Sequence, residues 1–420
     1  MRIFLMELRR SPLRWWLPVL IALDLAVLFG RARWWVGVWP QASAAAQVPS
    51  FYVGPFLAAY ASWSAGRIHR LGFEDQLTAG SKSRWKVELI HLSVTVVFGL
   101  AAYSIGALVA AAASFDDAGA GFLWPGYLLL GSTLIVLCAA VGHIAGRWFP
   151  SPFSIPVISG LACFVALAMI GGPSKAELFV LSGAPNIELT SQGLALRMTL
   201  ALAVVAFAVH APRVLTGYSE GSVKLGTRLP AVGCIALTVA CLVGMLSSGP
   251  LRVARQAPNT PLCTTAKPKI CLWPEEKKYL PQVEDIARRV SELPPKIKSP
   301  GVFYEEGLRK NASNDTDFTI FEGSMWEVAN SMSIAISRTS TPPYCPAETN
   351  TAEDRRIMAY FELDSWLAAR ISGAGQPANI HGGPPGVDQK EIAKIIKWPK
   401  VDQESWALKR LDTIKGTRCE

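Results

Sequence analysis

The sequence predicts an all-α polytopic membrane bundle of six or seven transmembrane helices, followed by a C-terminal domain that is mostly helical, of the α or α+β class. Half of the 420 residues are hydrophobic and only 17% are charged, whereas soluble domains carry about 25% charged residues. The charge is also unevenly divided, since residues 1–250 hold 17 Lys/Arg and 10 Asp/Glu while residues 251–420 hold 24 and 22. We therefore expect lipid around the first part and water around the second.

Seven apolar stretches approach the roughly 20 residues that a helix needs to cross the hydrocarbon core of a bilayer. One is short and contains Gly54 and Pro55, and another carries Arg197, whose long side chain can snorkel to the interface. The predicted organisation is an interfacial helix over 1–14, a transmembrane domain over 15–249, a Pro- and Thr-rich linker over 250–268 and a soluble domain over 269–420. The candidate spans are 15–31, 51–66, 88–113, 125–146, 153–171, 192–211 and 230–249.

Basic residues in the short connecting segments predict the orientation of these spans. The N-terminus and the segments 67–87 and 212–229 are rich in Lys and Arg, whereas the loops 114–124 and 172–191 carry a single Lys between them. Because cytoplasmic loops are enriched in basic residues, the first three belong in the cytoplasm. Two arginines at the outer end of the first span are the exception. Seven spans then place the N-terminus in the cytoplasm and the C-terminal domain outside.

The first residues predict a short helix that lies in the cytoplasmic interface. Ile3, Leu5, Met6 and Leu8 can line one face of such a helix, with basic residues nearer the other face. An ordinary basic flank before the first span is the alternative interpretation.

Four cysteines of the C-terminal domain, Cys263, Cys271, Cys345 and Cys419, are candidates for two disulfides if that domain lies in an oxidising compartment. Three pairings are possible, and proximity favours Cys263–Cys271, which leaves Cys345–Cys419. Four free thiols in a cytoplasmic domain are the alternative. A metal site is not expected, because the domain has no Cys-x-x-Cys and His381 is its only histidine.

Catalytic patterns are missing, so we expect no enzyme activity, no catalytic residues and no cofactor. The sequence contains no GxxxxGK[ST] loop that would cradle a nucleotide phosphate. The run from Trp326 to Asn330 has the spacing of a helical HExxH zinc motif but lacks both histidines. The net positive charge lies mostly in the membrane half, where it reports topology, so nucleic acid is not an expected partner.

Polar residues inside apolar spans are functional candidates by default. Asp24 lies near the middle of the first span and is the intramembrane polar candidate. It could pair with a base, bind a cation, contact a substrate, or be protonated and bonded to a neighbouring helix. His143, near the end of the fourth span, is expected to be interfacial and structural.

Periodicity in the C-terminal domain predicts both helices and short strands. The expected helices cover 279–293, 323–338, 352–372, 388–397 and 402–413, and the expected strands cover 269–273, 302–305 and 317–321.

The segment between the second and third spans is the most informative for function. It runs from Trp63 to Lys86 and contains an Arg-rich, Gly-containing turn, an acidic pair, a Leu and a Ser-x-x-Arg-Trp-like entry into the next span. In these features it resembles permease subunits of ABC-2-type transporters from high-GC Gram-positive bacteria (actinobacteria), whose coupling helix at this place docks on an ATPase subunit. The resemblance covers about 1–250 and makes Arg67, Arg70, Glu74, Asp75 and Leu77 the candidates for that contact. A solvated loop is the alternative interpretation.

The resemblance implies a membrane-spanning subunit of a transporter, with export as the expected direction, in the bacterial plasma membrane. Its expected partners are a separate ABC ATP-binding subunit, the lipid bilayer and a second permease, in a homodimer or heterodimer. The family core has six spans, so a seventh at 230–249 would be an addition. The run Cys271-Leu-Trp-Pro-Glu-Glu276 resembles an element in extracytoplasmic tails of similar actinobacterial permeases. A non-transporting sensor or immunity protein that presents an extracytoplasmic binding domain is the alternative function.

Overall fold

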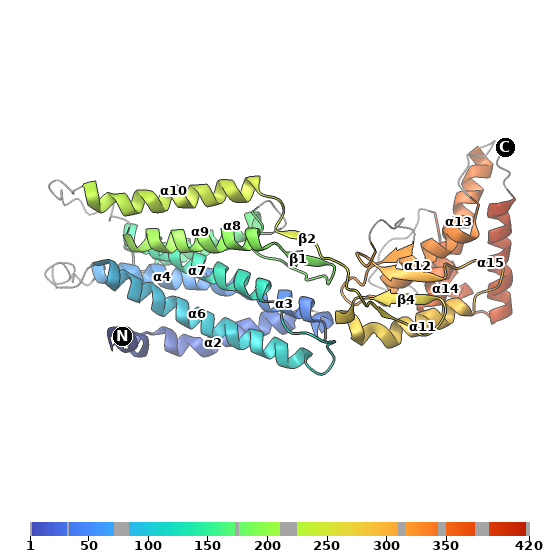
Figure 1. Cartoon of the computed structure of the whole chain (residues 1–420), viewed down its shortest axis with the longest axis horizontal. Helices are drawn as coiled ribbons and strands as arrows, with labels where there is room; N and C mark the ends of the chain where they lie inside the picture. Colours follow the sequence, from blue (N-terminus) through green and yellow to red (C-terminus); the bar gives the residue numbers. More distant parts are fainter. Residues whose placement is uncertain are drawn as a thin grey trace. The chain divides into compact units, whose positions relative to one another are not determined.

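The computed structural model describes residues 2–31, 33–70, 84–172, 176–210, 225–309, 316–342, 350–373 and 386–416. The chain divides into two compact units (Figure 1). Met1–Asp116 and Gly121–Val253 form the first unit, and Asp117–Ala120 and Ala254–Glu420 form the second.

The first unit is a bundle of helices. Among the described residues, five helices are long and apolar enough to cross a membrane, and the apolar helix Ser154–Met169 is shorter. Each predicted span coincides with a helix, which confirms a helical membrane bundle, while the number of spans stays a prediction. The helices are α1 (Arg2–Arg10), α2 (Leu13–Gly30), α3 (Trp39–Gln47), α4 (Ser50–Arg70), α6 (Arg84–Ser114), α7 (Pro125–Trp148), α8 (Ser154–Ile170), α9 (Ser191–His210) and α10 (Leu225–Ser247).

Close packing of α4 on α7 depends on two glycines one turn apart. A Cβ at Gly142 would overlap the backbone of Ala58, and a Cβ at Gly146 would overlap the backbone of Ser62. Small residues spaced by four positions let helix backbones approach closely, which is how helices gain van der Waals contact where lipid removes the hydrophobic driving force.

Helix α3 was not expected from the sequence, and all nine of its residues are buried. Five of its nine residues, 42–46, are Ala or Ser, and the helix packs beside α6 and α7. Its polar groups serve neighbouring backbone, since the Ser43 hydroxyl accepts the Trp124 N–H at 2.7 Å and Gln47 Oε1 accepts the Val180 N–H at 3.0 Å. Buried amide groups that have no water must find such acceptors.

Arg197 does not snorkel as expected, because its side chain is 3% exposed on α9. The guanidinium donates to the carbonyl oxygens of Ala176, Glu177 and Gly193 at 2.6–2.9 Å. Two carbonyls of the loop before α9 and one from the preceding turn of α9 therefore replace the water that an interface would have offered.

The second unit joins a four-stranded sheet to a set of helices. Strand order is β3-β4-β5-β6, with β3 antiparallel to β4 and the other two pairs parallel. Its strands are β3 (Leu262–Cys263), β4 (Lys269–Leu272), β5 (Val302–Glu305) and β6 (Asp317–Phe318), and its helices are the 3₁₀ segment η2 (Pro274–Tyr279), α11 (Leu280–Ser291), α12 (Met325–Ser340), α13 (Asn350–Ser372), α14 (Gln389–Ile395) and α15 (Lys400–Lys415). A separate two-stranded sheet pairs β1 (Ile187–Leu189) with β2 (Arg252–Ala254).

All eight predicted elements of this unit appear as helices or strands at nearly the expected positions. The stretch expected to be a linker, 250–268, is partly regular, because it supplies β2 and β3. Strand β3 is too short for periodicity to reveal, and it exists because it pairs with β4.

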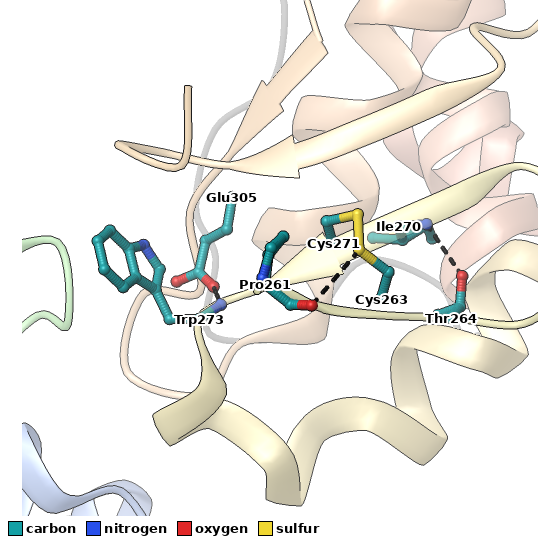
Figure 2. Close-up of a disulfide and its surroundings, with 7 residues drawn as sticks. All are labelled: Pro261, Cys263, Thr264, Ile270, Cys271, Trp273 and Glu305. Atoms are coloured by element: carbon teal, nitrogen blue, oxygen red, sulfur yellow. Dashed lines mark hydrogen bonds between the residues drawn. A yellow bond between two sulfur atoms is a disulfide. The ribbon is translucent and has the colours of Figure 1, made fainter. Parts of the chain in front are cut away.

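The disulfide Cys263–Cys271 is present, as proximity predicted (Figure 2). The two cysteines are direct partners in the antiparallel β3–β4 register, with Cα atoms 4.0 Å apart. Closing so short a loop is worth about 2–3 kcal/mol in the chain-entropy description. The disulfide therefore holds strand β3, near the start of this unit, to strand β4.

The second predicted disulfide, Cys345–Cys419, lies outside the described residues and stays a prediction. Pro342 and Ile414 line one cavity of about 400 Å³, so described chain a few residues before each cysteine lies close together. We expect non-reducing peptide mapping by mass spectrometry to recover a Cys345–Cys419 cross-linked peptide. Recovery of both cysteines as alkylated thiols in protein isolated without reductant would contradict the pairing.

Candidate functional site

A buried ion network joins helices at the end of the bundle where α4 ends and α6 begins. Glu88, in the second turn of α6, is 2% exposed. Its Oε2 lies 3.1 Å from Nε2 of His143, and its Oε1 lies 3.4 Å from Nε of Arg147. His143 and Arg147 are one turn apart on α7, so both side chains face the same carboxylate. The two glycines that bring α7 against α4 directly precede these two bases along the chain.

Arg147 extends the network to a third helix. Its Nη1 donates to the carbonyl oxygens of Ala208 and Val209, in the last turn of α9. Carbonyls in the last turn of a helix lack intrahelical donors and carry partial negative charge, so a guanidinium satisfies them well. A buried charge is tolerated when it is paired and hydrogen-bonded in this way.

Helix α1 is attached to the same part of α6. One turn beyond Glu88, Nδ1 of His91 lies 3.5 Å from Oε1 of Glu7 on α1. The start of α6 is thus connected by titratable side chains to α1 and α7, and through Arg147 to α9. We call Glu88, His143 and Arg147 the α6 base network.

Sequence reasoning did not single out Glu88 or Arg147, and it expected His143 to be interfacial and structural. His143 is 1% exposed and meets Glu88 inside the bundle, while its depth in the membrane stays a prediction. A usable signal was present: a carboxylate at one end of an apolar helix and two bases four residues apart on another.

The residues predicted to contact an ATPase lie just before this network. Arg67 is exposed in the last turn of α4, and Arg70 is the final residue of that helix. Glu74, Asp75 and Leu77 lie outside the described residues. The coupling assignment therefore stays a prediction.

Asp24 lies at the interface of α2 and α6, away from the α6 base network. Its side chain is 1% exposed, and neither carboxyl oxygen has a hydrogen-bond partner within the described ranges. Gly106 of α6 makes room for it, since a Cβ there would overlap the carboxyl group. Gly106 follows Glu88 by 18 positions, or roughly 27 Å along a helix. Asp24 and Glu88 are thus two separate polar positions on α6.

A second constellation forms where β4 ends in the second unit, at the run from Cys271 to Glu276. Trp273 is fully buried. One of its two N–H groups bonds to the last residue of β5, and the other bonds to the residue that follows β5. Its backbone N–H donates to Glu305 Oε2 at 2.9 Å (Figure 2), and its indole N–H donates to the Glu306 carbonyl at 3.0 Å. The run is thereby fixed to the sheet by the disulfide on one side and the indole on the other.

Arg255 covers this tryptophan from the chain that enters the unit. Its guanidinium carbon lies 5.0 Å from the centre of the indole ring, and its Nη1 lies 2.7 Å from Glu275 Oε1. A cation over an aromatic face gains electrostatic attraction, and the Glu275 carboxylate balances its charge.

Two further carboxyl groups are buried beside Trp273. Glu276 is 0% exposed and Glu305 is 4% exposed, and their side chains lie within hydrogen-bonding reach of each other. Burial raises the pKa of Glu305 to about 7. Burial and the neighbouring Glu305 raise the pKa of Glu276 well above its ordinary value.

The degenerate zinc-motif spacing at 326–330 opens helix α12. Glu327 is the third residue of that helix, and its N–H donates to the N-cap Ser324 hydroxyl at 3.3 Å. The segment thus supplies a helix start. Across the described ranges, no group of three or more His, Cys, Asp or Glu has an arrangement that could hold a metal ion.

Comparison with known proteins reaches only the second unit. A domain of unknown function, DUF7224, matches residues 270–417, about a third of the chain. No curated protein and no solved structure matches the chain. The matched range begins at β4 and contains the whole Cys271–Glu276 constellation.

We predict that Glu88→Gln destabilises the bundle by about 3–5 kcal/mol, because Arg147 is left buried without its carboxylate. Equilibrium unfolding in mixed micelles measures the change. Lys86→Gln, an exposed change two residues earlier in α6, is the matched control and should leave the free energy of unfolding within about 0.5 kcal/mol of wild type. Equal stability of the two variants would mean that the ion pair does not hold α6 to α7.

We predict that Trp273→Ala costs about 3–5 kcal/mol, because it empties a core position and removes one hydrogen bond. Limited proteolysis of the full-length protein should then cut within 254–420 at lower denaturant concentration. Trp398→Ala is the control, since that indole is 43% exposed and should change the cleavage midpoint little. An unchanged cleavage midpoint for Trp273→Ala would mean that Trp273 does not stabilise the second unit.

Proposed function

We propose that the chain is the membrane-spanning permease subunit of an ABC-type exporter, driven by a separate ATP-binding subunit that docks on the 67–87 segment. The observation that carries the proposal is the position of the α6 base network. It begins at Glu88, directly after that segment, in the first turns of the helix that the segment enters.

Rigid connection at this place suits a permease that receives motion from a partner. A displacement of the segment before α6 acts on a helix whose base is ion-paired to α7 and, through Arg147, bonded to α9. Helices joined by paired buried charges move together more readily than they separate, because separation would leave charges unpaired in the membrane interior. Such rigid-body movement is a common form of conformational switching.

The proposed orientation of the chain in the membrane rests on the basic connecting segments and on the disulfide. The basic segments 67–87 and 212–229 favour the cytoplasmic side. The bond between Cys263 and Cys271 supports an extracytoplasmic second unit, because disulfides persist in oxidising compartments. The N-terminus is then cytoplasmic, and an odd number of spans, seven, connects the two sides.

A second candidate function is a non-transporting sensor or immunity protein that presents the second unit for binding. The compactness of that unit, Ala254–Glu420, favours this alternative. It requires no ATPase, so the two functions separate on whether such a subunit binds.

We predict that Glu74→Lys combined with Asp75→Lys abolishes complex formation with the proposed ATP-binding subunit. Reversal of both charges places like charges where the docking groove would offer bases. Co-purification after co-expression measures binding, and ATP turnover of the complex in nanodiscs measures coupling. We expect loss of both signals with normal membrane insertion.

The control for this experiment is Asp116→Lys combined with Asp117→Lys, an equal change of charge in the loop after α6. This variant should bind the ATPase and hydrolyse ATP as the wild type does. If the segment variant also behaves as wild type, the docking site is elsewhere. If no ATPase binds the wild-type chain, the sensor alternative stands.

A further inference from the structure

Glu276 and Glu305 are two buried carboxyl groups whose side chains lie within hydrogen-bonding reach of each other. Glu276 lies in η2 and Glu305 ends β5, so the pair joins the Cys271–Glu276 run to the neighbouring strand. Among the described residues, no N–H or O–H group donates a hydrogen bond to either carboxyl oxygen of Glu276. We propose that this pair is a proton-binding site, whose single shared proton holds the Cys271–Glu276 run against β5 and is released as the surrounding pH rises.

The proton is required by electrostatics. Two carboxylates within hydrogen-bonding distance repel strongly in a buried site, so one of them keeps its proton and donates it to the other. Glu305 already accepts one hydrogen bond from the Trp273 backbone N–H at 2.9 Å. That bond favours Glu305 as the ionised acceptor and Glu276 as the protonated donor, because a hydrogen bond to a carboxylate stabilises its charged form.

Neighbouring groups do not remove the need for this proton. On the Glu276 side the charged or titratable neighbours are Glu275, Lys278 and Tyr279, and Glu306 follows Glu305 on the strand side. The Arg255 guanidinium pairs with Glu275 at 2.7 Å. Glu275 and Glu306 add negative charge, and Lys278 only partly offsets it.

The direction of the pH effect follows from the folded and unfolded states. In the unfolded chain both carboxyls ionise near the ordinary value for Glu, about 4.3. In the folded unit burial raises the pKa of Glu305 to about 7 and raises that of Glu276 well above its ordinary value. The folded state therefore keeps protons that the unfolded chain has lost. This contribution to stability is complete below about pH 4 and falls as pH rises from there toward the raised pKa values of the pair.

This inference is independent of the transport proposal, since it concerns only the interior of the second unit. Its consequence is a local one. Loss of the proton weakens the attachment of the Trp273 segment to β5, so the segment 271–279 opens more often in alkaline than in acidic surroundings.

Hydrogen exchange of the full-length protein in nanodiscs tests the proposal between pH 5 and pH 8.5. After correction for intrinsic exchange, the opening equilibrium constant of 271–279 should rise by up to about tenfold for each pH unit between 5 and 7. Glu276→Gln supplies a permanent donor to Glu305 without a titrating proton, so its profile should be nearly flat and its opening at pH 8 lower than that of wild type.

Glu305→Gln is the reciprocal variant and should flatten the profile in the same way, while Glu391→Gln, an exposed carboxyl on α14, should keep the wild-type profile. A flat wild-type profile, or a slope that survives both Gln variants, would overturn the proposal. So would suppression of opening at pH 8 by micromolar Ca²⁺ in wild type but not in Glu276→Gln, because the pair would then be a cation site.

Discussion

The requirement that a charge inside a membrane bundle be paired organises the first unit. Glu88 pairs with His143 and Arg147, and Nη1 of Arg147 donates to the carbonyls that end α9. The glycines before each base let α7 approach α4, which fixes the face that α7 turns toward α6. Breaking any member would leave a charge or a carbonyl without a partner where no water replaces it. The same rule explains why Arg197 collects three carbonyls.

Asp24 departs from this rule, and the difference is informative. The α6 base network consists of permanent partners, whereas the Asp24 carboxyl fits into a space left by Gly106 and meets no base among the described residues. An uncharged carboxyl at the α2–α6 interface costs far less than a charged one. The bundle therefore contains one position where buried groups are paired and another where a buried carboxyl has no hydrogen-bond partner among the described residues.

In the second unit, a small sheet of short strands is held together at its edge. Strands of two to four residues have few ladder hydrogen bonds, so the disulfide and the two N–H groups of Trp273 supply the attachment. Burying Glu276 and Glu305 beside that indole makes the attachment sensitive to protons. The matched domain of unknown function begins at β4, and the Cys271–Glu276 run lies at its start.

Local pattern determined much of this protein. Apolar stretches located every long helix of the bundle, periodicity located the helices and three strands of the second unit, and short separation identified the Cys263–Cys271 bond. These features depend on residues close together in the sequence, where spacing alone carries the information. Tertiary structure decided the rest. It buried α3, added β3 to the sheet, moved His143 and Arg197 inside, and placed Glu88 against α7 and Glu276 against Glu305. Each of these results depends on groups from distant segments whose partners replace water, and no local period records which segments meet.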